Sequence, residues 1–174
     1  MRFDEKSPTR PSHESGKICL EAEERIRAWV NSRDGSATAI ILRFAGLYGP
    51  GRVVRRSLVE RGEPIPGDPE KWLKLIHVDD AALAAIAALE TTAAPSLYLV
   101  ADDRPVSRRE YYSVIAGLIG APEPCFGVPR PGTPEAVRDA SSKRVRNHRM
   151  RERLGLTLRY PDIATGLPAA LDRK

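Results

Sequence analysis

Apolar residues along this 174-residue chain alternate between helical and extended spacing. From Gly16 to Ser32 they recur every three or four positions, which predicts an amphipathic helix. Thr38 to Phe44 is a largely apolar run rich in β-branched residues, which is typical of a strand buried on both faces of a parallel sheet. Shorter strands are predicted over Trp72 to Val78 and over Ser96 to Ala101. Helices and strands that alternate in this way indicate the α/β class with parallel strands.

Capping signals predict further helices in the second half of the chain. One is expected after Asp79 or Asp80, because a carboxylate there can cap the first turn. Another begins at a capping box formed by Ser107 and Glu110. A last, basic helix is predicted to end at residues 154–155.

The composition, with 41% hydrophobic and 29% charged residues, is that of an ordinary globular protein. No apolar stretch approaches the ~18 residues of a membrane span, and the polar first residues lack the core of a secretory signal. Cys19 and Cys125 give neither a disulfide framework nor a metal-ligand spacing, so we expect no metal site and a cytoplasmic location. Cys19 lies beside the apolar face of the first helix and is expected to be buried and inert.

The net charge of +5 comes largely from two basic clusters, at residues 52–61 and 138–159. Such clusters can hold a phosphate-bearing ligand or nucleic acid. Aromatic residues do not interleave with them, so a solvated basic surface is favoured and nucleic acid is not the expected partner.

Two motifs stand out against this background. Residues 43–52 read Arg-Phe-Ala-Gly-Leu-Tyr-Gly-Pro-Gly-Arg, and residues 76–82 read Ile-His-Val-Asp-Asp-Ala-Ala. In this order and spacing they resemble the NAD-dependent epimerase/dehydratase family, the extended short-chain dehydrogenases/reductases, and its atypical branch in particular. Residues 97–107 and 142–161 are similar to later segments of that family, and residues 8–23 are similar to the start of its catalytic helix.

The resemblance implies a partial Rossmann-like, doubly wound parallel sheet with a small C-terminal substrate-binding subdomain. Residues 1–50 would form the C-terminal part of a Rossmann-like domain. Residues 51–174 would form the substrate-side subdomain, with residues 79–101 returning to the Rossmann sheet. In the family these motifs lie in the second half of the protein, and the glycine-rich dinucleotide loop that precedes them is not found in this chain.

Catalysis in the family uses a Tyr-x-x-x-Lys pair, in which the lysine lowers the pKa of the tyrosine that transfers the proton. The resemblance places Ser15 at the tyrosine position and Cys19 at the lysine position. A serine hydroxyl is too weak an acid without an adjacent base. Lys17 lies two positions before the lysine site, close to the opposite side of the helix. We therefore predict no catalytic residue in this chain and no oxidoreductase chemistry by the chain alone.

A glycine cluster over residues 46–51 also lies between a predicted strand and a helix, but its spacing is not that of a dinucleotide fingerprint. By the resemblance, this loop flanks the nicotinamide of NAD or NADP, and Ala45, Gly46 and Leu47 would be the residues nearest to that ring. Neither dinucleotide is expected to bind tightly to this chain alone.

Three residues are candidates for contacts with a small-molecule substrate, such as a nucleotide-sugar. Tyr48 shapes the loop above the sheet, and Arg52 and Lys74 are candidates for contacts with anionic groups. A lysine supplies a point charge rather than the bidentate fork of an arginine. His77, within an apolar strand, is expected to be a hydrogen-bonded structural residue.

Three functions follow from these features. The first is the C-terminal, substrate-side part of an NAD(P)-dependent epimerase/dehydratase, which would need an N-terminal half or self-association to cover its exposed strand edge. The second is a stand-alone, non-catalytic ligand-binding module. The third is a basic interaction protein that binds nucleic acid or an acidic partner with strong salt dependence.

Overall fold

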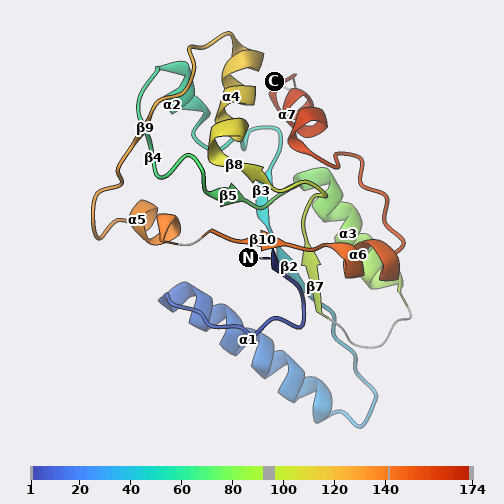
Figure 1. Cartoon of the computed structure of the whole chain (residues 1–174). Coiled ribbons are helices and arrows are strands. Elements are labelled where there is room, and N and C mark those ends of the chain that lie inside the picture. The colour runs from blue at the N-terminus through green and yellow to red at the C-terminus, as the bar shows by residue number, and fades with distance from the viewer. Residues whose placement is uncertain (1, 92–96, 141, 173–174) are drawn as a thin grey trace.

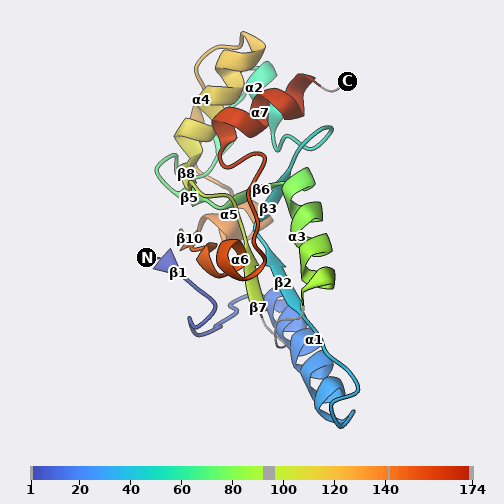
Figure 2. The same ribbon diagram turned by 90° about the vertical axis from the view of Figure 1, so that its right-hand side faces the viewer.

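The computed structural model describes residues 2–91, 97–140 and 142–172. Its helices are α1 (Glu14–Asn31), α2 (Arg56–Glu60), α3 (Val78–Glu90), α4 (Arg108–Ile119), α5 (Pro134–Asp139), α6 (His148–Arg153) and α7 (Ile163–Asp172). Its strands are β1 (Arg2–Phe3), β2 (Ile41–Phe44), β3 (Gly46–Tyr48), β4 (Ile65–Pro66), β5 (Trp72–Leu73), β6 (Leu75–His77), β7 (Leu97–Val100), β8 (Val106–Ser107), β9 (Phe126–Gly127) and β10 (Arg144–Val145). Helices α2, α4 and α7 gather at one end of the molecule and α1 lies at the other (Figures 1 and 2).

Two parallel strand pairs form the centre of the fold. β2 runs parallel to β7, and β3 runs parallel to β6. The chain passes from the first pair to the second at Ala45, whose N–H donates to the Val100 carbonyl at 2.8 Å. The next amide, that of Gly46, donates to the Lys74 carbonyl at 3.0 Å. These bonds connect the two pairs, and the α/β class with parallel strands predicted from the sequence is confirmed.

The first predicted strand is shorter and less buried than its apolar run indicates. β2 begins at Ile41 rather than Thr38, and the side chain of Phe44 at its end is 42% exposed. Within the described residues, β2 has one hydrogen-bonded neighbour, β7, and its other edge has no strand partner. A strand with one neighbour exposes apolar side chains that a strand in the middle of a parallel sheet would bury. Ser96, at the start of another predicted strand, lies outside the described residues.

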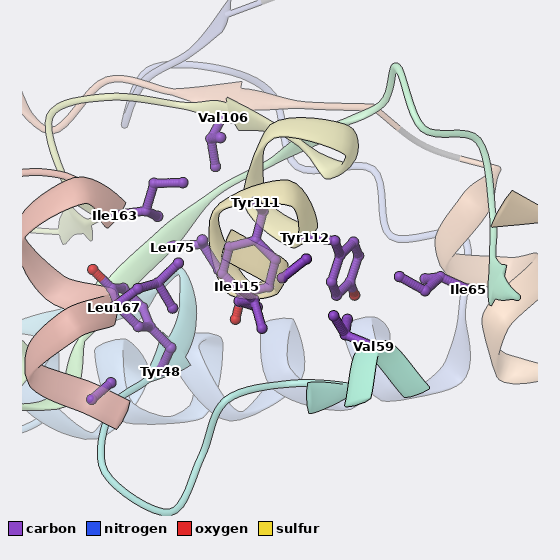
Figure 3. Close-up of a cluster of buried hydrophobic side chains, with 12 residues drawn as sticks. Tyr48, Val59, Ile65, Leu75, Val106, Tyr111, Tyr112, Ile115, Ile163 and Leu167 are labelled. Atoms are coloured by element: carbon purple, nitrogen blue, oxygen red, sulfur yellow. The ribbon is translucent and has the colours of Figure 1, made fainter. Parts of the chain in front are cut away.

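The larger hydrophobic core joins α2, α4 and α7 around the end of β3. Tyr111, Tyr112 and Ile115 of α4 lie in its middle, between Tyr48 of β3 and Val59 of α2 (Figure 3). Leu167 of α7 closes the side near Tyr48. Most residues of this core belong to residues 51–174, which the family resemblance predicts to form the substrate-side subdomain.

A second core lies between the β2–β7 pair and helices α3 and α6. Its buried members include Ile76, Ala84, Tyr98 and Met150. Alanines such as Ala84 form the buried face of α3, so this helix can approach the strands closely. The larger side chains of α3 point away from this core, and Leu83 and Ile86 are 43% and 51% exposed.

The helix caps confirm one prediction and correct another. Ser107 caps α4 by accepting the N–H of Glu110 at 3.1 Å, as the capping box predicts. The cap of α3 is neither Asp79 nor Asp80, which lie inside the first turn. His77 occupies the cap position, and its Nδ1 accepts the N–H of Asp79 at 3.2 Å. The prediction was wrong because a neutral imidazole nitrogen is also a hydrogen-bond acceptor.

Asp80 is instead completely buried, where it holds a distant part of the backbone. Its two carboxylate oxygens accept the N–H groups of Arg159 and Tyr160, each at 2.8 Å. A buried carboxylate requires such donors, because removal from water is costly for a charged group without partners. The bonds fix the segment before α7 against the first turn of α3.

The predicted end of the basic helix is correct, since α6 ends at Arg153. It is not the last helix, however, because α7 follows it. Gly166 and Pro168 interrupt the helical signal of this segment in the sequence. In the structure Gly166 is required by packing, since a Cβ at this position would lie 2.8 Å from Cζ of Tyr48.

Replacement of Gly166 by alanine is expected to destabilise the fold by about 1–3 kcal/mol, because the added methyl group overpacks the core against the Tyr48 ring. The free energy of unfolding from urea denaturation measures this loss. Gly117→Ala is the matched control, since Gly117 lies in α4 with open space around its Cα. It should stabilise by about 0.5–1 kcal/mol through helix propensity. Equal effects of the two substitutions would contradict the packing role of Gly166.

Candidate functional site

A pocket of about 600 Å³ lies between α1, the N-terminal segment and the sheet. It opens near Ala45, where β2 ends, which is the edge of a parallel sheet where ligands bind in open α/β folds. Its walls are mainly apolar side chains, namely Phe3, Leu20, Leu42, Phe44, Leu99 and Val145. The pocket therefore offers an apolar enclosure with a limited number of polar groups, the usual composition of a small-molecule site.

Arg43 and Glu23 form one wall and neutralise each other. The guanidinium donates to both carboxylate oxygens, with Nε and Nη2 each 2.7 Å from an oxygen. The hydrogen bond from Arg43 is the main cause that lowers the pKa of Glu23, against the opposing effect of burial. This bidentate pair connects α1 to β2.

Two lysines in the pocket are not neutralised in the same way. Lys74 precedes β6 and Lys143 precedes β10, and both line the pocket. Although the Lys74 residue is solvent-accessible, surrounding protein lowers its pKa, and the positive charge of Lys143 lowers it further. Within the described residues, neither ammonium group forms an ion pair with an acid. Lys143 instead lies 5.6 Å from the centre of the Phe3 ring. The two charges thus favour an anionic group in the pocket.

Of the residues predicted to bind cofactor, the structure places Ala45 in the pocket lining. Gly46 and Leu47 are not among the lining residues. A Cβ on Gly46 would lie 3.2 Å from the Lys74 carbonyl oxygen, so this glycine permits close approach of β3 and β6. Leu47 packs, partly buried, against the second core.

Of the residues predicted to bind substrate, Lys74 lines the pocket, whereas Tyr48 and Arg52 do not. Tyr48 is fully buried, its hydroxyl donates to the Asp162 carbonyl at 3.4 Å, and burial raises its pKa. Arg52 is exposed, and its Nε donates to the Leu47 carbonyl at 3.1 Å. Substrate contacts by Tyr48 and Arg52 stay predictions, while their observed contacts stabilise the fold.

The glycine loop after β3 does not present an anion cradle. The N–H of Gly49 donates to the Arg52 carbonyl at 3.3 Å, and the N–H of Arg52 donates back to the Gly49 carbonyl at 2.9 Å. A pyrophosphate cradle needs backbone amides that point freely at the ligand. The amides of Gly49 and Arg52 are bonded within the loop and are not directed at a ligand.

The two positions aligned with the family's catalytic pair lie at the start of α1. Ser15 and Cys19 are both exposed, and Cys19 lines the pocket. The expectation that Cys19 is buried is wrong, because none of the residues of α1 is fully buried. The apolar face of this helix is only partly covered, so its sequence pattern does not correspond to burial within the described chain.

Lys143 was not among the predicted site residues, although it belongs to the basic cluster at residues 138–159. It lies near Lys74 because residues 142–144 pack on β5, where the N–H of Trp72 donates to the Ser142 hydroxyl at 3.1 Å and the Arg144 guanidinium lies 4.6 Å from the centre of the Trp72 ring. The pairing of β1 with β10 adds residues near the N-terminus to the same pocket. A search of the described residues gives no group of three or more side chains able to hold a metal ion.

No protein-family model matches the chain. A search of curated proteins gives YeeZ from Escherichia coli K12, 27% identical over 158 residues, which are 91% of this chain and 52% of YeeZ. Human short-chain dehydrogenase/reductase family 42E member 1 is 32% identical over 111 residues, which are 55% of this chain and 28% of that protein. The chain thus spans about half the length of YeeZ, and the match to the human protein covers a smaller share.

Solved structures show the same relationship over nearly the whole chain. A conserved protein of unknown function from Silicibacter pomeroyi matches with a TM-score of 0.84 and 31% identity, covering 98% of this chain and 60% of that one. MoeE5, solved with UDP-glucuronic acid and NAD, matches with a TM-score of 0.80 and 26% identity, covering 98% and 58%. A UDP-glucose 4-epimerase from Thermotoga maritima, 20% identical, shares the fold with a TM-score of 0.74.

The proteins similar to this chain include short-chain dehydrogenases/reductases and a protein from Methylobacillus flagellatus described as an NAD-dependent epimerase/dehydratase, 29% identical with a TM-score of 0.69. The resemblance to the epimerase/dehydratase family drawn from residues 43–52 and 76–82 is therefore confirmed. So is the Rossmann-like α/β fold. No helix in the described part of the chain is long and apolar enough to cross a membrane.

Glu23→Gln tests the pair that connects α1 to the sheet. Removal of the charge should lower the hydrogen-exchange protection of the α1 amides roughly tenfold, because a half-buried ion pair loses one partner. Glu21→Gln is the matched control, since Glu21 forms an exposed pair with Arg25 on the same helix. That control should change protection by less than about twofold.

The same pair predicts a pH dependence. The pKa of Glu23 is lowered from its ordinary 4.5, so its stabilising contribution is present above that pH and lost as the pH falls through the lower, folded-state pKa. Protection of the α1 amides in the unsubstituted protein should therefore drop as the pH falls below 4.5 and through the lowered pKa of Glu23, whereas the Glu23→Gln variant shows no such drop from this site. Equal protection of the α1 amides in the Glu23→Gln and Glu21→Gln variants would show that other contacts hold the helix.

Proposed function

We propose that this chain is the C-terminal, substrate-side part of an NAD(P)-dependent sugar-nucleotide epimerase/dehydratase-like protein, and that it binds ligand without catalysing a reaction alone. The observation that carries the proposal is the pocket at the end of β2. It combines apolar walls with two lysines that have no acidic partner among the described residues. Cys19, which the family resemblance places at the catalytic lysine position, lines this pocket, whereas Ser15 at the tyrosine position does not.

Binding is supported by the size and charge of the pocket. A volume of about 600 Å³ is suited to a ligand of the size of a sugar with attached groups. Lys74 and Lys143 would contact a phosphate or carboxylate group, and the apolar walls would exclude water around the rest of the ligand. MoeE5, a structural neighbour, is a protein solved with UDP-glucuronic acid, which carries both kinds of anion.

The absence of catalysis alone is supported by the chemistry of the two aligned positions. A proton-transferring group must lie within reach of the substrate and have a pKa near the working pH. An exposed serine without an adjacent base does not meet the second condition. Cys19 lines the pocket but carries no positive charge that could lower the pKa of a neighbouring hydroxyl.

An N-terminal half is the proposed partner. Within the described residues, one edge of β2 pairs with β7 and the other edge has no strand partner. Leu83 and Ile86 of α3 are exposed apolar side chains that a further element could cover. A doubly wound sheet continues past such a strand and covers both faces with helices. Under this proposal, residues 1–50 complete the Rossmann-like domain of the partner half, and residues 51–174 form the substrate side, with residues 79–101 returning to the sheet. Ala45, Gly46 and Leu47 would then flank the nicotinamide.

Calorimetric titration with UDP-glucose, and separately with NAD, tests the proposal. We expect the chain to bind UDP-glucose and not to bind NAD at millimolar concentration. Lys74→Met and Lys143→Met should each weaken UDP-glucose binding by roughly tenfold or more, because each removes a charged hydrogen-bond donor. Lys17→Met is the matched control, since Lys17 is exposed on α1 and pairs with Glu14.

The alternatives give different results in the same experiment. Tight NAD binding would contradict the proposal, because it requires a cofactor site within this chain. Unchanged UDP-glucose affinity in both pocket variants would place the ligand elsewhere. Binding of random-sequence DNA that weakens steeply with salt would favour the basic interaction protein. Sedimentation of the chain over a range of concentrations separates a fragment from a stand-alone module, since the unpaired strand edge of a fragment favours self-association.

A further inference from the structure

Asp102 is a buried carboxyl group that the pocket does not use. It follows β7, it is only 4% exposed, and its N–H donates to the Leu75 carbonyl at 2.8 Å. Its Oδ2 atom is inaccessible to solvent and has no hydrogen-bond partner among the described residues. A carboxylate in such surroundings would be strongly disfavoured.

The charged groups near Asp102 are acids from three directions. Asp103 is its neighbour in the chain, Asp80 lies in α3, and Asp162 precedes α7. The hydroxyl of Tyr48, from β3, is near enough for the negative charge of Asp102 to raise its pKa.

The nearby donors are directed to other acceptors. The Asn147 side-chain amide donates to the Ala101 and Asp102 carbonyls and to Oδ1 of Asp103. Arg151 of α6 pairs with Asp103. The Asp80 carboxylate accepts the backbone N–H of Arg159. No cation within the described residues pairs with Asp102, so Asp102 itself lacks a matching positive charge, while Arg151 is paired with Asp103.

These surroundings favour the neutral form of the acid. Burial is the main cause that raises the pKa of Asp102 to about 8, and the charges of Asp103, Asp162 and Asp80 contribute in the same direction. A neutral carboxyl group is a known solution for a buried acid without a counter-charge.

Asp102 lies where the C-terminal segment joins the sheet. The N–H of Asp103 donates to the Pro161 carbonyl at 2.9 Å, and Asp80 accepts the N–H of Tyr160. Asp162 then accepts the N–H of Thr165 in the first turn of α7 at 3.0 Å. A negative charge on Asp102 would repel the carboxylates on both sides of this junction.

We propose that Asp102 is a proton-dependent latch: its neutral carboxyl group lets the segment over residues 159–162 close onto the sheet, and its ionisation loosens that junction. This inference is independent of the proposed function, since it concerns neither the lysines nor the ligand pocket. The loosened element would be α7, which packs against α4 and Tyr48 in the larger core.

The direction of the pH effect follows from linkage. The unfolded chain loses the Asp102 proton near the ordinary value of 3.8, whereas the folded protein keeps it to about pH 8. The stabilisation from this group is therefore complete below pH 4 and is lost progressively as the pH rises to about 8. Above that value the folded protein carries the full cost of a buried charge.

Thermal melts of the whole chain from pH 5 to pH 9 test the latch. Asp102→Asn keeps the shape of the side chain and cannot ionise. We expect it to melt several degrees above the unsubstituted protein at pH 9, with the difference shrinking toward pH 5. Asp34→Asn is the matched control, because Asp34 is an exposed acid with a positive φ of 46°, a conformation that asparagine tolerates.

The difference in melting temperature between the Asp34→Asn control and the unsubstituted protein should stay constant across this pH range. A lower melting temperature of Asp102→Asn at every pH would overturn the proposal, since it would mean that the carboxylate is the required form. A second measurement does not depend on the variant. The carboxyl ¹³C chemical shift of Asp102 should titrate well above pH 6, and titration near pH 4 would also overturn the latch.

Discussion

The two backbone bonds to Asp80 determine how the rest of this fold is assembled. Asp80 is fully buried and forms no ion pair with a cation of the described residues, so N–H groups must satisfy its carboxylate, and here they come from Arg159 and Tyr160. Those bonds place the segment before α7 against the first turn of α3. The position of that segment allows Leu167 and Gly166 to pack on Tyr48, which completes the larger core. A local charge requirement is thus linked to the packing of a helix that begins about eighty residues later.

Local signals in the sequence were sufficient for elements whose stability is determined nearby. The helical spacing from Gly16 predicts α1, and the Ser107 hydroxyl caps α4 as its capping box predicts. The cap of α3 could not be predicted, because the choice between His77 and Asp80 depends on the distant amides that Asp80 binds. The helix α7 was missed for a related reason, since Gly166 is present to accommodate a tyrosine ring from another element.

The candidate site shows the same division. Ala45, predicted from the motif over residues 43–52 to flank the nicotinamide, and Lys74, predicted to contact an anionic group, both line the pocket, and their ligand contacts stay predictions. The basic cluster at residues 138–159 includes Lys143, but its place in the pocket could not be predicted, since it depends on the contacts of residues 142–144 with β5 and on the pairing of β1 with β10. Exposure was also misjudged for Cys19, because an amphipathic pattern records which face of a helix is apolar and not whether anything covers it.

The pairing of β1 with β10 has a practical consequence for work on this protein. The residues before α1 are polar, as in terminal segments that are often removed before crystallisation. They are in fact a wall of the pocket, with Phe3 beside Lys143 and with the Ser7 hydroxyl donating to the Asp4 carboxylate at 3.0 Å. A protein without these residues would lose β1, the strand that pairs with β10. A failure to bind a ligand would then reflect the loss of this strand pair rather than the chemistry of the site.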